Sequence, residues 1–365
     1  MVYLLLVVGF IFLVKGADFF VSGSSAIARH FGIPAFIIGL TVVAFGTSMP
    51  EAAISVTAAL TGANGIAVGN ALGSNMFNLL VVLGASSLIK ECPVSRDTLR
   101  LEYPVSIVAA GVLLVMSGAV RYISAYGFIG SRGAAIGVLS HIDGLVLLAF
   151  FVVFMISTVR KAMREQDIEA IPDYCGGADV SDPGACIMDE TGELICEEKD
   201  VVEIPKDNSS GSNVNGSLST SIIQLATGLA GIVLGGDMVV DSAVNIAEAF
   251  GIDGILIGLT IVALGTSLPE LVISIVAAVK GETDIAVGNV IGSNIFNLLL
   301  VLGLSTSIHP IAITIFSMYD LIILIAASLI VLIPLARKQM ITRGWGALML
   351  IMYGGYLAYI IVRTL

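Results

Sequence analysis

Two glutamates stand within long apolar segments, each directly after a proline. Residues 46–51 read GTSMPE and residues 265–270 read GTSLPE, so Glu51 and Glu270 hold the same place in two copies of one motif. A carboxylate at the centre of a bilayer costs at least about 2.5 kcal/mol even on the lenient insertion scale. Two of them at matching positions indicate a function, and binding a cation is the chemistry they fit.

The residues around each glutamate can supply further oxygen atoms. A proline inside a helix removes an amide donor and crowds the preceding turn, so a kink or break is expected at Pro50 and Pro269. Backbone carbonyls near 43–47 and 262–266 would then lack helical partners. Hydroxyl oxygens stand beside them, on Thr47, Ser48, Thr266 and Ser267. Each glutamate begins the next half-helix, where the helix dipole favours a negative charge.

A second duplicated motif follows in the next apolar segment of each copy. Residues 69–75 read GNALGSN and residues 288–294 read GNVIGSN. Neutral oxygens recur every four residues, and so share one helix face, on Asn70, Ser74, Asn78, Asn289, Ser293 and Asn297. This face can complete a coordination shell, although each of these side chains alone could serve equally well as an interhelical hydrogen-bond partner. The pairs Gly69/Gly73 and Gly288/Gly292 would allow a close helix approach.

The type of ligand narrows the type of ion. Carboxylate, hydroxyl, amide and carbonyl oxygens suit hard cations such as Ca²⁺ and Na⁺, and the apolar segments hold no His or Cys cluster that would suit zinc or copper. A hydrolase is disfavoured, because Ser48 and Ser267 have no membrane-embedded His or Lys beside them to activate a nucleophile. We expect no enzymatic activity and no cofactor.

The elements that position these groups are expected to be membrane helices. The 365 residues are 57% hydrophobic and 12% charged, with a mean hydropathy of +1.00, which places the chain in lipid and gives no sign of a nucleic-acid partner. Ten apolar stretches are long enough to span a bilayer: 2–27, 33–61, 64–90, 98–119, 138–160, 218–249, 252–280, 283–307, 312–336 and 343–363. The expected fold is an all-α membrane protein.

An internal repeat organises these spans. Residues 32–89 match residues 251–308 at 35 of 58 positions without a gap, an offset of 219. Five spans per copy is an odd number, so equivalent helices would cross the membrane in opposite senses. Inverted repeats of this kind are a transporter architecture with a substrate site near the midplane. We therefore expect one five-helix repeat in residues 1–160 and a second in 218–365.

The segment between the repeats, residues 161–217, differs in composition. It carries 14 of the 28 acidic residues and ends in a Ser-, Asn- and Gly-rich run, which predicts a linker. With the N-terminus outside the cell, thirteen Lys and Arg residues fall on the cytoplasmic side and three outside. This predicts a cell-membrane protein with both termini outside and a cytoplasmic linker, whose cysteines are then not expected to form disulfides.

At both duplicated motifs the sequence strongly resembles the sodium/calcium exchanger branch of the cation/calcium antiporter superfamily, in which GTSxPE is followed by GNxxGSN. The resemblance implies exchange of Na⁺ for Ca²⁺ in a ten-span inverted fold. It implies ion ligands at Ala44, Thr47, Ser48, Glu51, Ser74, Asn78, Ala263, Thr266, Ser267, Glu270, Ser293 and Asn297, with the two alanines acting through their backbone carbonyls.

Two positions refine what the resemblance implies. Asn297 stands where the potassium-dependent branch has an aspartate associated with K⁺ co-transport, and Glu270 stands where that branch tends to have aspartate, so a potassium-independent type is expected. Proton-coupled relatives carry GNxxE, and Gly73 and Gly292 occupy the place of that glutamate here. Ca²⁺/H⁺ exchange and, from another class, a cation channel remain as alternatives. The expected partners are Ca²⁺, Na⁺ and membrane lipid, and the expected unit is a monomer.

Overall fold

The computed structural model describes residues 2–62, 64–126, 135–169, 186–188, 194–196, 218–250 and 263–364. Within these ranges, eight helical spans are long and apolar enough to cross a membrane, or nine if a bent pair is one span. Five of the eight are single helices, namely α1 (Val2–Phe31), α10 (His141–Glu169), α11 (Leu218–Ala249), α17 (Ile315–Lys338) and α18 (Arg343–Thr364).

The other spans are composed of consecutive short helices. One is α7 (Arg96–Arg100) with α8 (Glu102–Met116), and the two others each contain a π-helical turn: α5 (Asn64–Phe77), η2 (Asn78–Val82) and α6 (Leu83–Ile89), then α15 (Thr283–Ile295), η4 (Phe296–Val301) and α16 (Leu302–Ile308). The bent span comprises α2 (Ala35–Ile38), η1 (Gly39–Val43), α3 (Ala44–Thr47) and α4 (Met49–Leu60). The all-helical fold class is confirmed.

The seventh span predicted from the sequence, 252–280, is described only in its second part. Residues 251–262 lie outside the described residues, and the rest forms α13 (Ala263–Thr266) and α14 (Leu268–Lys280). The count of ten spans therefore stays a prediction. Most of the predicted linker also lies outside the described residues, although α10 continues as far as Glu169, eight residues past the membrane segment that ends at Lys161.

The central helices of the bundle are those that carry the second duplicated motif. In the most apolar 18 residues of each span, 94% are buried in the span of α15 and 78% in the span of α5. The corresponding share is 22% in the spans of α10 and α18. Gly288 and Gly292 account for part of this close packing: a Cβ on Gly288 would lie 2.9 Å from Leu40 N, and one on Gly292 would lie 2.6 Å from Ala44 Cβ. The close approach predicted for this pair is confirmed. By the repeat offset of 219, the segment equivalent to residues 36–43 is 255–262, which lies outside the described residues, so the close approach predicted for Gly69 and Gly73 stays a prediction.

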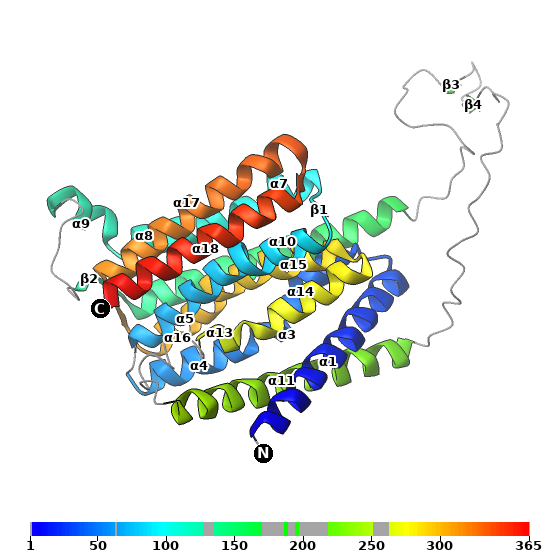
Figure 1. The fold of residues 1–365 in the computed structure, drawn as a ribbon. Helices are drawn as coiled ribbons and strands as arrows, with labels where there is room; N and C mark the ends of the chain where they lie inside the picture. Colours follow the sequence, from blue (N-terminus) through cyan, green and yellow to red (C-terminus); the bar gives the residue numbers. More distant parts are fainter. Residues whose placement is uncertain are drawn as a thin grey trace.

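Helices α1 and α11 lie side by side and cross on one flank of the bundle (Figure 1). Glycines make the crossing possible, because a Cβ on Gly16 would lie 2.8 Å from Gly228 O, and one on Gly235 would lie 2.6 Å from Leu13 N. At one end, Lys280 Nζ lies 2.6 Å from Asp18 Oδ1 and Arg29 Nη1 lies 3.5 Å from Glu282 Oε1. These two ion pairs fasten α1 to α14 and to the turn that precedes α15.

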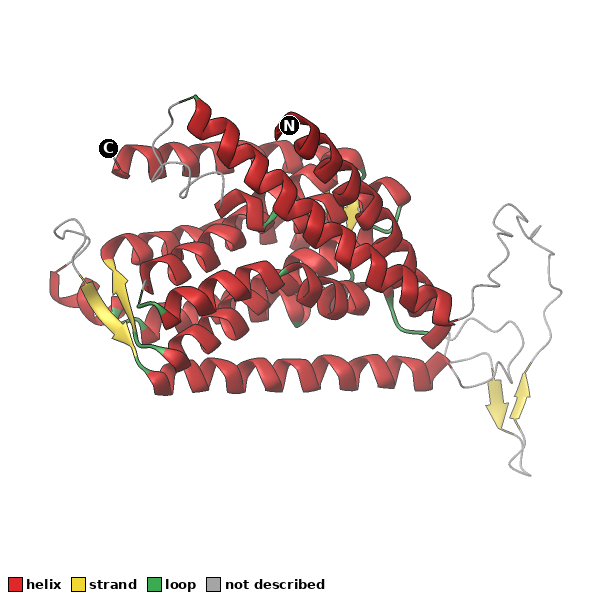
Figure 2. Ribbon diagram, turned by 90° about the horizontal axis from the view of Figure 1, so that it is seen from below, coloured by secondary structure: helices red, strands yellow, loops and turns green. Residues whose placement is uncertain are grey.

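Three short antiparallel strand pairs complete the described structure. They are β1 (Cys92–Pro93) with β6 (Met340–Ile341), β2 (Ala135–Leu139) with β5 (Ile311–Thr314), and β3 (Cys186–Met188) with β4 (Leu194–Cys196). The first two pairs join the two halves of the chain, and β2 with β5 lies at one end of the bundle (Figure 2). Cys92 is fully buried in β1, and burial raises the pKa of its thiol to about 12, which fits a packing role.

Substitution of Gly228 by Val should destabilise the protein. The added Cβ would lie 2.5 Å from Phe20 N and 2.8 Å from Gly16 O, so α1 and α11 must separate, at an expected cost of about 1–3 kcal/mol. The measurement is the midpoint of thermal unfolding in detergent. Gly354→Val is the control, since a Cβ there meets no described atom within 4 Å. Equal midpoints for the two variants would contradict the proposed close crossing.

Candidate ion-binding site

Both predicted helix breaks are present. Helix α3 ends at Thr47 and α4 begins at Met49, with a bend of 46° within their span, and Ser48 between them has φ −84° and ψ 5°. Ser267 separates α13 from α14 with nearly the same angles, φ −92° and ψ 7°. Each proline stands in the first turn of the second half-helix, where no amide hydrogen is needed. The break places the following glutamate in that same first turn.

Each glutamate is held by a serine of the other repeat. Ser267 Oγ donates a hydrogen bond to Glu51 Oε1 at 3.0 Å, and Ser48 Oγ donates to Glu270 Oε1 at 3.2 Å. Both glutamates have an exposed fraction of 0%. The two broken helices therefore face each other, and the carboxylates lie close enough for the charge of Glu270 to act on Glu51.

No basic side chain compensates these two carboxylates among the described residues. The ion pairs found there involve Asp18, Glu102, Glu282 and Asp320. The second oxygen of each glutamate, Oε2, is buried without a hydrogen-bond partner. Two buried carboxylates that face each other across the repeats form a site of strong negative potential that a cation can neutralise.

Asn78 and Asn297 provide two further buried oxygens. Both side chains are fully buried, and neither their Nδ2 nor their Oδ1 atoms have a hydrogen-bond partner. Asn78 is the first residue of η2 and Asn297 is the second residue of η4, so both stand where the central helices change from α to π geometry. Turns of this kind are frequent at functional sites.

Most of the remaining predicted ligands form hydrogen bonds within the site. Ser74 Oγ donates to Glu51 Oε1 at 3.4 Å, and Ser293 Oγ lies 3.5 Å from Thr47 Oγ1. The Ala44 carbonyl accepts hydrogen bonds from Ser48 N at 3.0 Å and from Thr47 Oγ1 at 3.3 Å. The expectation that the break leaves carbonyls near 43–47 without helical partners is therefore wrong for Ala44, because the helical turn continues as far as Ser48 N. Thr266 is also buried. Ala263 begins α13 at the edge of the described residues.

Four more polar residues contact the site: Asn70 and Asn289, which the sequence placed on the polar helix faces, and Ser55 and Ser274, which it did not single out. Asn70 Nδ2 donates to Glu51 O at 3.1 Å and to Ser55 Oγ at 3.0 Å. The second repeat has the same contacts, made by Asn289 with Glu270 O at 3.4 Å and with Ser274 Oγ at 3.0 Å. The identity of Ser55 and Ser274 at the offset of 219 was the available signal in the sequence.

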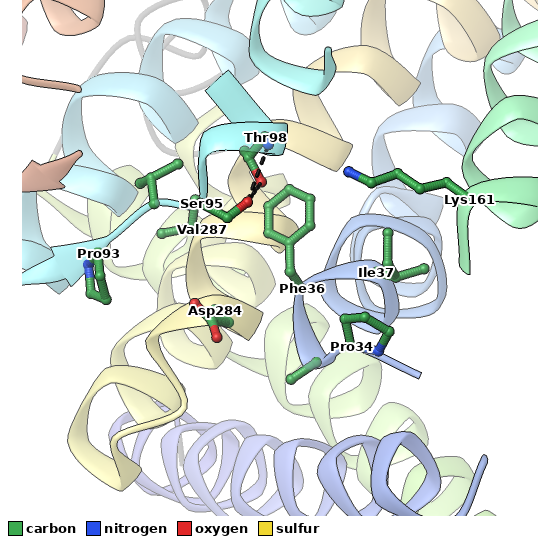
Figure 3. A pocket seen from close by; sticks show the side chains of 11 residues that line it. Pro34, Phe36, Ile37, Pro93, Ser95, Thr98, Lys161, Asp284 and Val287 are labelled. Atoms are coloured by element: carbon green, nitrogen blue, oxygen red, sulfur yellow. Dashed lines mark hydrogen bonds between the residues drawn. The ribbon is translucent and has the colours of Figure 1, made fainter. Parts of the chain in front are cut away.

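A separate cavity of about 310 Å³ lies elsewhere and contains none of the predicted ligands (Figure 3). Its polar lining comprises Ser95, Thr98, Lys161 and Asp284. The hydroxyls of Ser95 and Thr98 lie 2.8 Å apart, and Lys161 Nζ lies 2.9 Å from the buried Glu102 Oε1. Because a lysine lines it, this cavity is a poor candidate for a cation.

The described residues contain no group of three or more His, Cys, Asp or Glu side chains that could hold a metal ion. A cation bound between the broken helices would therefore be held by two carboxylates and by neutral hydroxyl, amide and carbonyl oxygens. This ligand set suits a hard cation that is bound weakly enough to be released.

Comparison with protein families identifies the family to which the chain belongs. A model described as "Sodium/calcium exchanger protein" matches residues 1–159 and 220–362, which include both broken helices and both central helices. The chain belongs to the sodium/calcium exchanger family. Membership of this family makes it a cation/calcium antiporter, and confirms the resemblance seen in the two motifs.

Individual relatives agree with the family over nearly the whole chain. The sodium/calcium exchanger MaX1 of Methanosarcina acetivorans is 32% identical over 361 residues, 99% of this chain and 97% of the relative. The inner membrane protein YrbG of Escherichia coli is 37% identical over 306 residues, 84% of this chain and 79% of the relative. With the apolar helices, these matches make this family member a multi-pass membrane protein.

Solved structures extend the likeness to the fold. The sodium-calcium exchanger NCX_Mj, after soaking with 10 mM Na⁺ and no Ca²⁺, has a TM-score of 0.73 and 31% sequence identity to this chain. The match covers 98% of this chain and 99% of NCX_Mj.

The two serines that bridge the repeats should contribute about equally to ion affinity. Ser48→Ala and Ser267→Ala each remove one hydrogen bond to a buried carboxylate, worth about 1.5–3 kcal/mol. The Ca²⁺ concentration for half-maximal transport should change at least about fivefold in each variant and in the same direction. Ser124→Ala, on an exposed face of α9 (Ala119–Tyr126), is the control. A change in only one of the two variants would contradict the symmetric arrangement.

Proposed function

We propose that this protein exchanges Na⁺ for Ca²⁺ across the cell membrane, with both ions using the site between Glu51 and Glu270 alternately. The observation that carries the proposal is the pair of fully buried, adjacent glutamates with no basic partner among the described residues. Two negative charges neutralise one Ca²⁺ or most of the charge of a set of Na⁺ ions. Because the ions share ligands they compete, and an inward Na⁺ gradient can drive Ca²⁺ out.

The proposed ligand set has three kinds of oxygen. The carboxylates supply charge, the hydroxyls and amides fill the shell, and the second lone pairs of backbone carbonyls next to the helix breaks complete it. The set is Glu51, Glu270, Thr47, Ser48, Thr266, Ser267, Ser74, Ser293, Asn78, Asn297, and the backbone carbonyls of Ala44 and Ala263. Unpartnered buried oxygens on the two glutamates and on Asn78 and Asn297 support this set, since such atoms need an external partner.

The proposed architecture is ten spans in two inverted repeats, residues 1–160 and 218–365, joined by a cytoplasmic linker over 161–217, with both termini outside. Contacts within the site support the two-fold relation, because Ser48 with Glu270 and Ser267 with Glu51 are the same interaction at an offset of 219. Asn75 Nδ2 donates to the carbonyl of Asn294, its own equivalent, at 3.2 Å. A residue that contacts its own equivalent lies on the axis that relates the repeats.

Transport requires that the site open to one side at a time. In the proposed motion α1 and α11 slide together against the central helices, as a unit held by their glycine crossing. At one end the slide would have to break the ion pairs Lys280–Asp18 and Arg29–Glu282. Partly exposed ion pairs are weak, about 0–1 kcal/mol each, so they permit such a motion.

Sodium coupling is favoured over proton coupling by two observations. MaX1 and NCX_Mj are both named as exchangers of sodium and calcium. In addition, Gly73 and Gly292 stand where proton-coupled relatives are expected to carry glutamate. A proton-coupled protein would respond to a pH gradient without Na⁺, whereas a channel would conduct large currents without any counter-ion.

The experiment that tests the proposal is uptake of radioactive Ca²⁺ into proteoliposomes. An outward Na⁺ gradient should drive uptake by the wild type, and a pH gradient alone should not. Glu51→Gln and Glu270→Gln should each reduce uptake at least about 100-fold, because each removes one of two charges that compensate the ion in a buried site.

The matched control is Glu91→Gln, which changes an exposed glutamate between α6 and β1 and should leave most of the uptake intact. Na⁺-driven uptake that survived both substitutions in the site would remove Glu51 and Glu270 as ligands. Uptake that followed only the pH gradient would replace Na⁺ with H⁺ as the counter-ion.

Transport should not require K⁺. Asn297 provides a neutral amide where a potassium-dependent exchanger is expected to have a carboxylate, so the site lacks the extra charge for a third kind of ion. Na⁺-driven Ca²⁺ uptake should be the same within about twofold when K⁺ is replaced by an organic cation. A strict dependence on K⁺ would show that the side chain at 297 does not decide this property.

A further inference from the structure

The side-chain amides of Asn70 and Asn289 join three helices at the site. Asn289 belongs to α15, its Nδ2 contacts Glu270 O and Ser274 Oγ of α14, and its Oδ1 lies 3.2 Å from Thr47 Oγ1 of α3. Asn70 of α5 has the equivalent contacts, to Glu51 O, Ser55 Oγ and, at 3.5 Å, Thr266 Oγ1. Each asparagine thus connects the glutamate of its own repeat with a threonine of the other.

The chemistry of the partners fixes the orientation of each amide. A backbone carbonyl can only accept a hydrogen bond, so the group that faces Glu270 O must be the NH₂ group of Asn289. Its Oδ1 then faces Thr47, whose hydroxyl donates. The same reasoning places Oδ1 of Asn70 toward Thr266. Both amide oxygens are therefore already used as acceptors, unlike the unpartnered Oδ1 atoms of Asn78 and Asn297.

The hydroxyl of Thr47 has one proton and three possible acceptors, the most distant of which is Ser293 Oγ at 3.5 Å. Asn289 Oδ1 lies at 3.2 Å and the Ala44 carbonyl at 3.3 Å. A cation binds hydroxyl and carbonyl oxygens through their lone pairs, so the proton must point away from the ion. The Ala44 carbonyl already accepts a hydrogen bond from Ser48 N at 3.0 Å, so its second lone pair must not be taken by the Thr47 hydroxyl. Donation to Asn289 meets both conditions at once.

We propose that Asn70 and Asn289 are positioning residues for cation binding: they hold the two glutamate-bearing helices in place and turn the hydroxyls of Thr266 and Thr47 so that their lone pairs face the ion. The proposal rests on the proposed function of this site. It separates two kinds of asparagine on the same helices, with Asn78 and Asn297 contacting the ion, and Asn70 and Asn289 acting through the glutamates and threonines.

Replacing asparagine by aspartate distinguishes the two roles by the sign of the effect. At a ligand position the change adds a charged oxygen to the shell, so Asn297→Asp should lower the Ca²⁺ concentration for half-maximal transport. At Asn70 or Asn289 the change to aspartate removes both N–H donors and places a third carboxylate beside a glutamate. Asn289→Asp and Asn70→Asp should raise that concentration roughly tenfold or more, as the loss of one or two buried hydrogen bonds implies.

The measurement is Ca²⁺ uptake into proteoliposomes at several Ca²⁺ concentrations, with the maximal rate expressed per folded protein. A positioning role shifts the half-maximal concentration and leaves the ratio between Sr²⁺ and Ca²⁺ unchanged, whereas a purely structural role lowers only the amount of folded protein. Asn245→Asp, on an exposed part of α11, is the control.

Ser274→Ala and Ser55→Ala provide milder variants, since each removes a single acceptor from one amide. Both should raise the half-maximal concentration by a few-fold. Tighter Ca²⁺ binding in Asn289→Asp, or no change in the aspartate and alanine variants together, would overturn the proposal. If wild-type uptake followed a pH gradient and not Na⁺, the proposed coupling would fail, yet the same comparison under that gradient would still decide the role of the asparagines.

Discussion

The structure depends on one electrostatic constraint: two carboxylates are enclosed side by side in an apolar bundle without a basic partner among the described residues. Glu51 and Glu270 repel each other and have lost the solvation of water, so the arrangement is unfavourable unless hydrogen-bond donors and a cation compensate it. The serine hydroxyls supply part of that compensation, with one donor from the opposite repeat to each glutamate and a second donor, Ser74, to Glu51. The broken helices, the central glycines and the polar faces of α5 and α15 all follow from the need to place oxygen atoms and donors around this pair.

The duplicated motif places the donors and carboxylates around this pair, because the same short sequence forms the same local structure in both repeats. A break next to the proline places a serine and a glutamate in one turn, and the two copies face each other so that each serine reaches the other copy's glutamate. Neither repeat can form the site alone. In the proposed function, exchange of one ion for another follows because the same oxygens would serve any hard cation of suitable size and the two halves would provide two related routes to them.

The sequence predicted the parts of the site that depend on chemistry between neighbours along the chain. Pro50 and Pro269 predicted the breaks, and duplication identified Glu51 and Glu270 as a pair. Features that depend on packing between distant segments were not predictable. The π-helical turns at Asn78 and Asn297 had no signal in the sequence, since the FNLL runs there read as ordinary helix. The role of Asn70 and Asn289 became visible only once α4, α5, α14 and α15 were placed together. The short strand pairs between the halves had no periodic signal either.

The central claim is that one cation is held by both glutamates at once, and anomalous diffraction from crystals soaked in Sr²⁺ without Na⁺ tests it most directly. The account predicts one strong peak within coordination distance, about 2.3–2.7 Å, of a carboxylate oxygen of Glu51 and one of Glu270, and its loss when Na⁺ is added in excess. A peak that touched only one of the two glutamates, or that persisted unchanged in high Na⁺, would contradict the shared site.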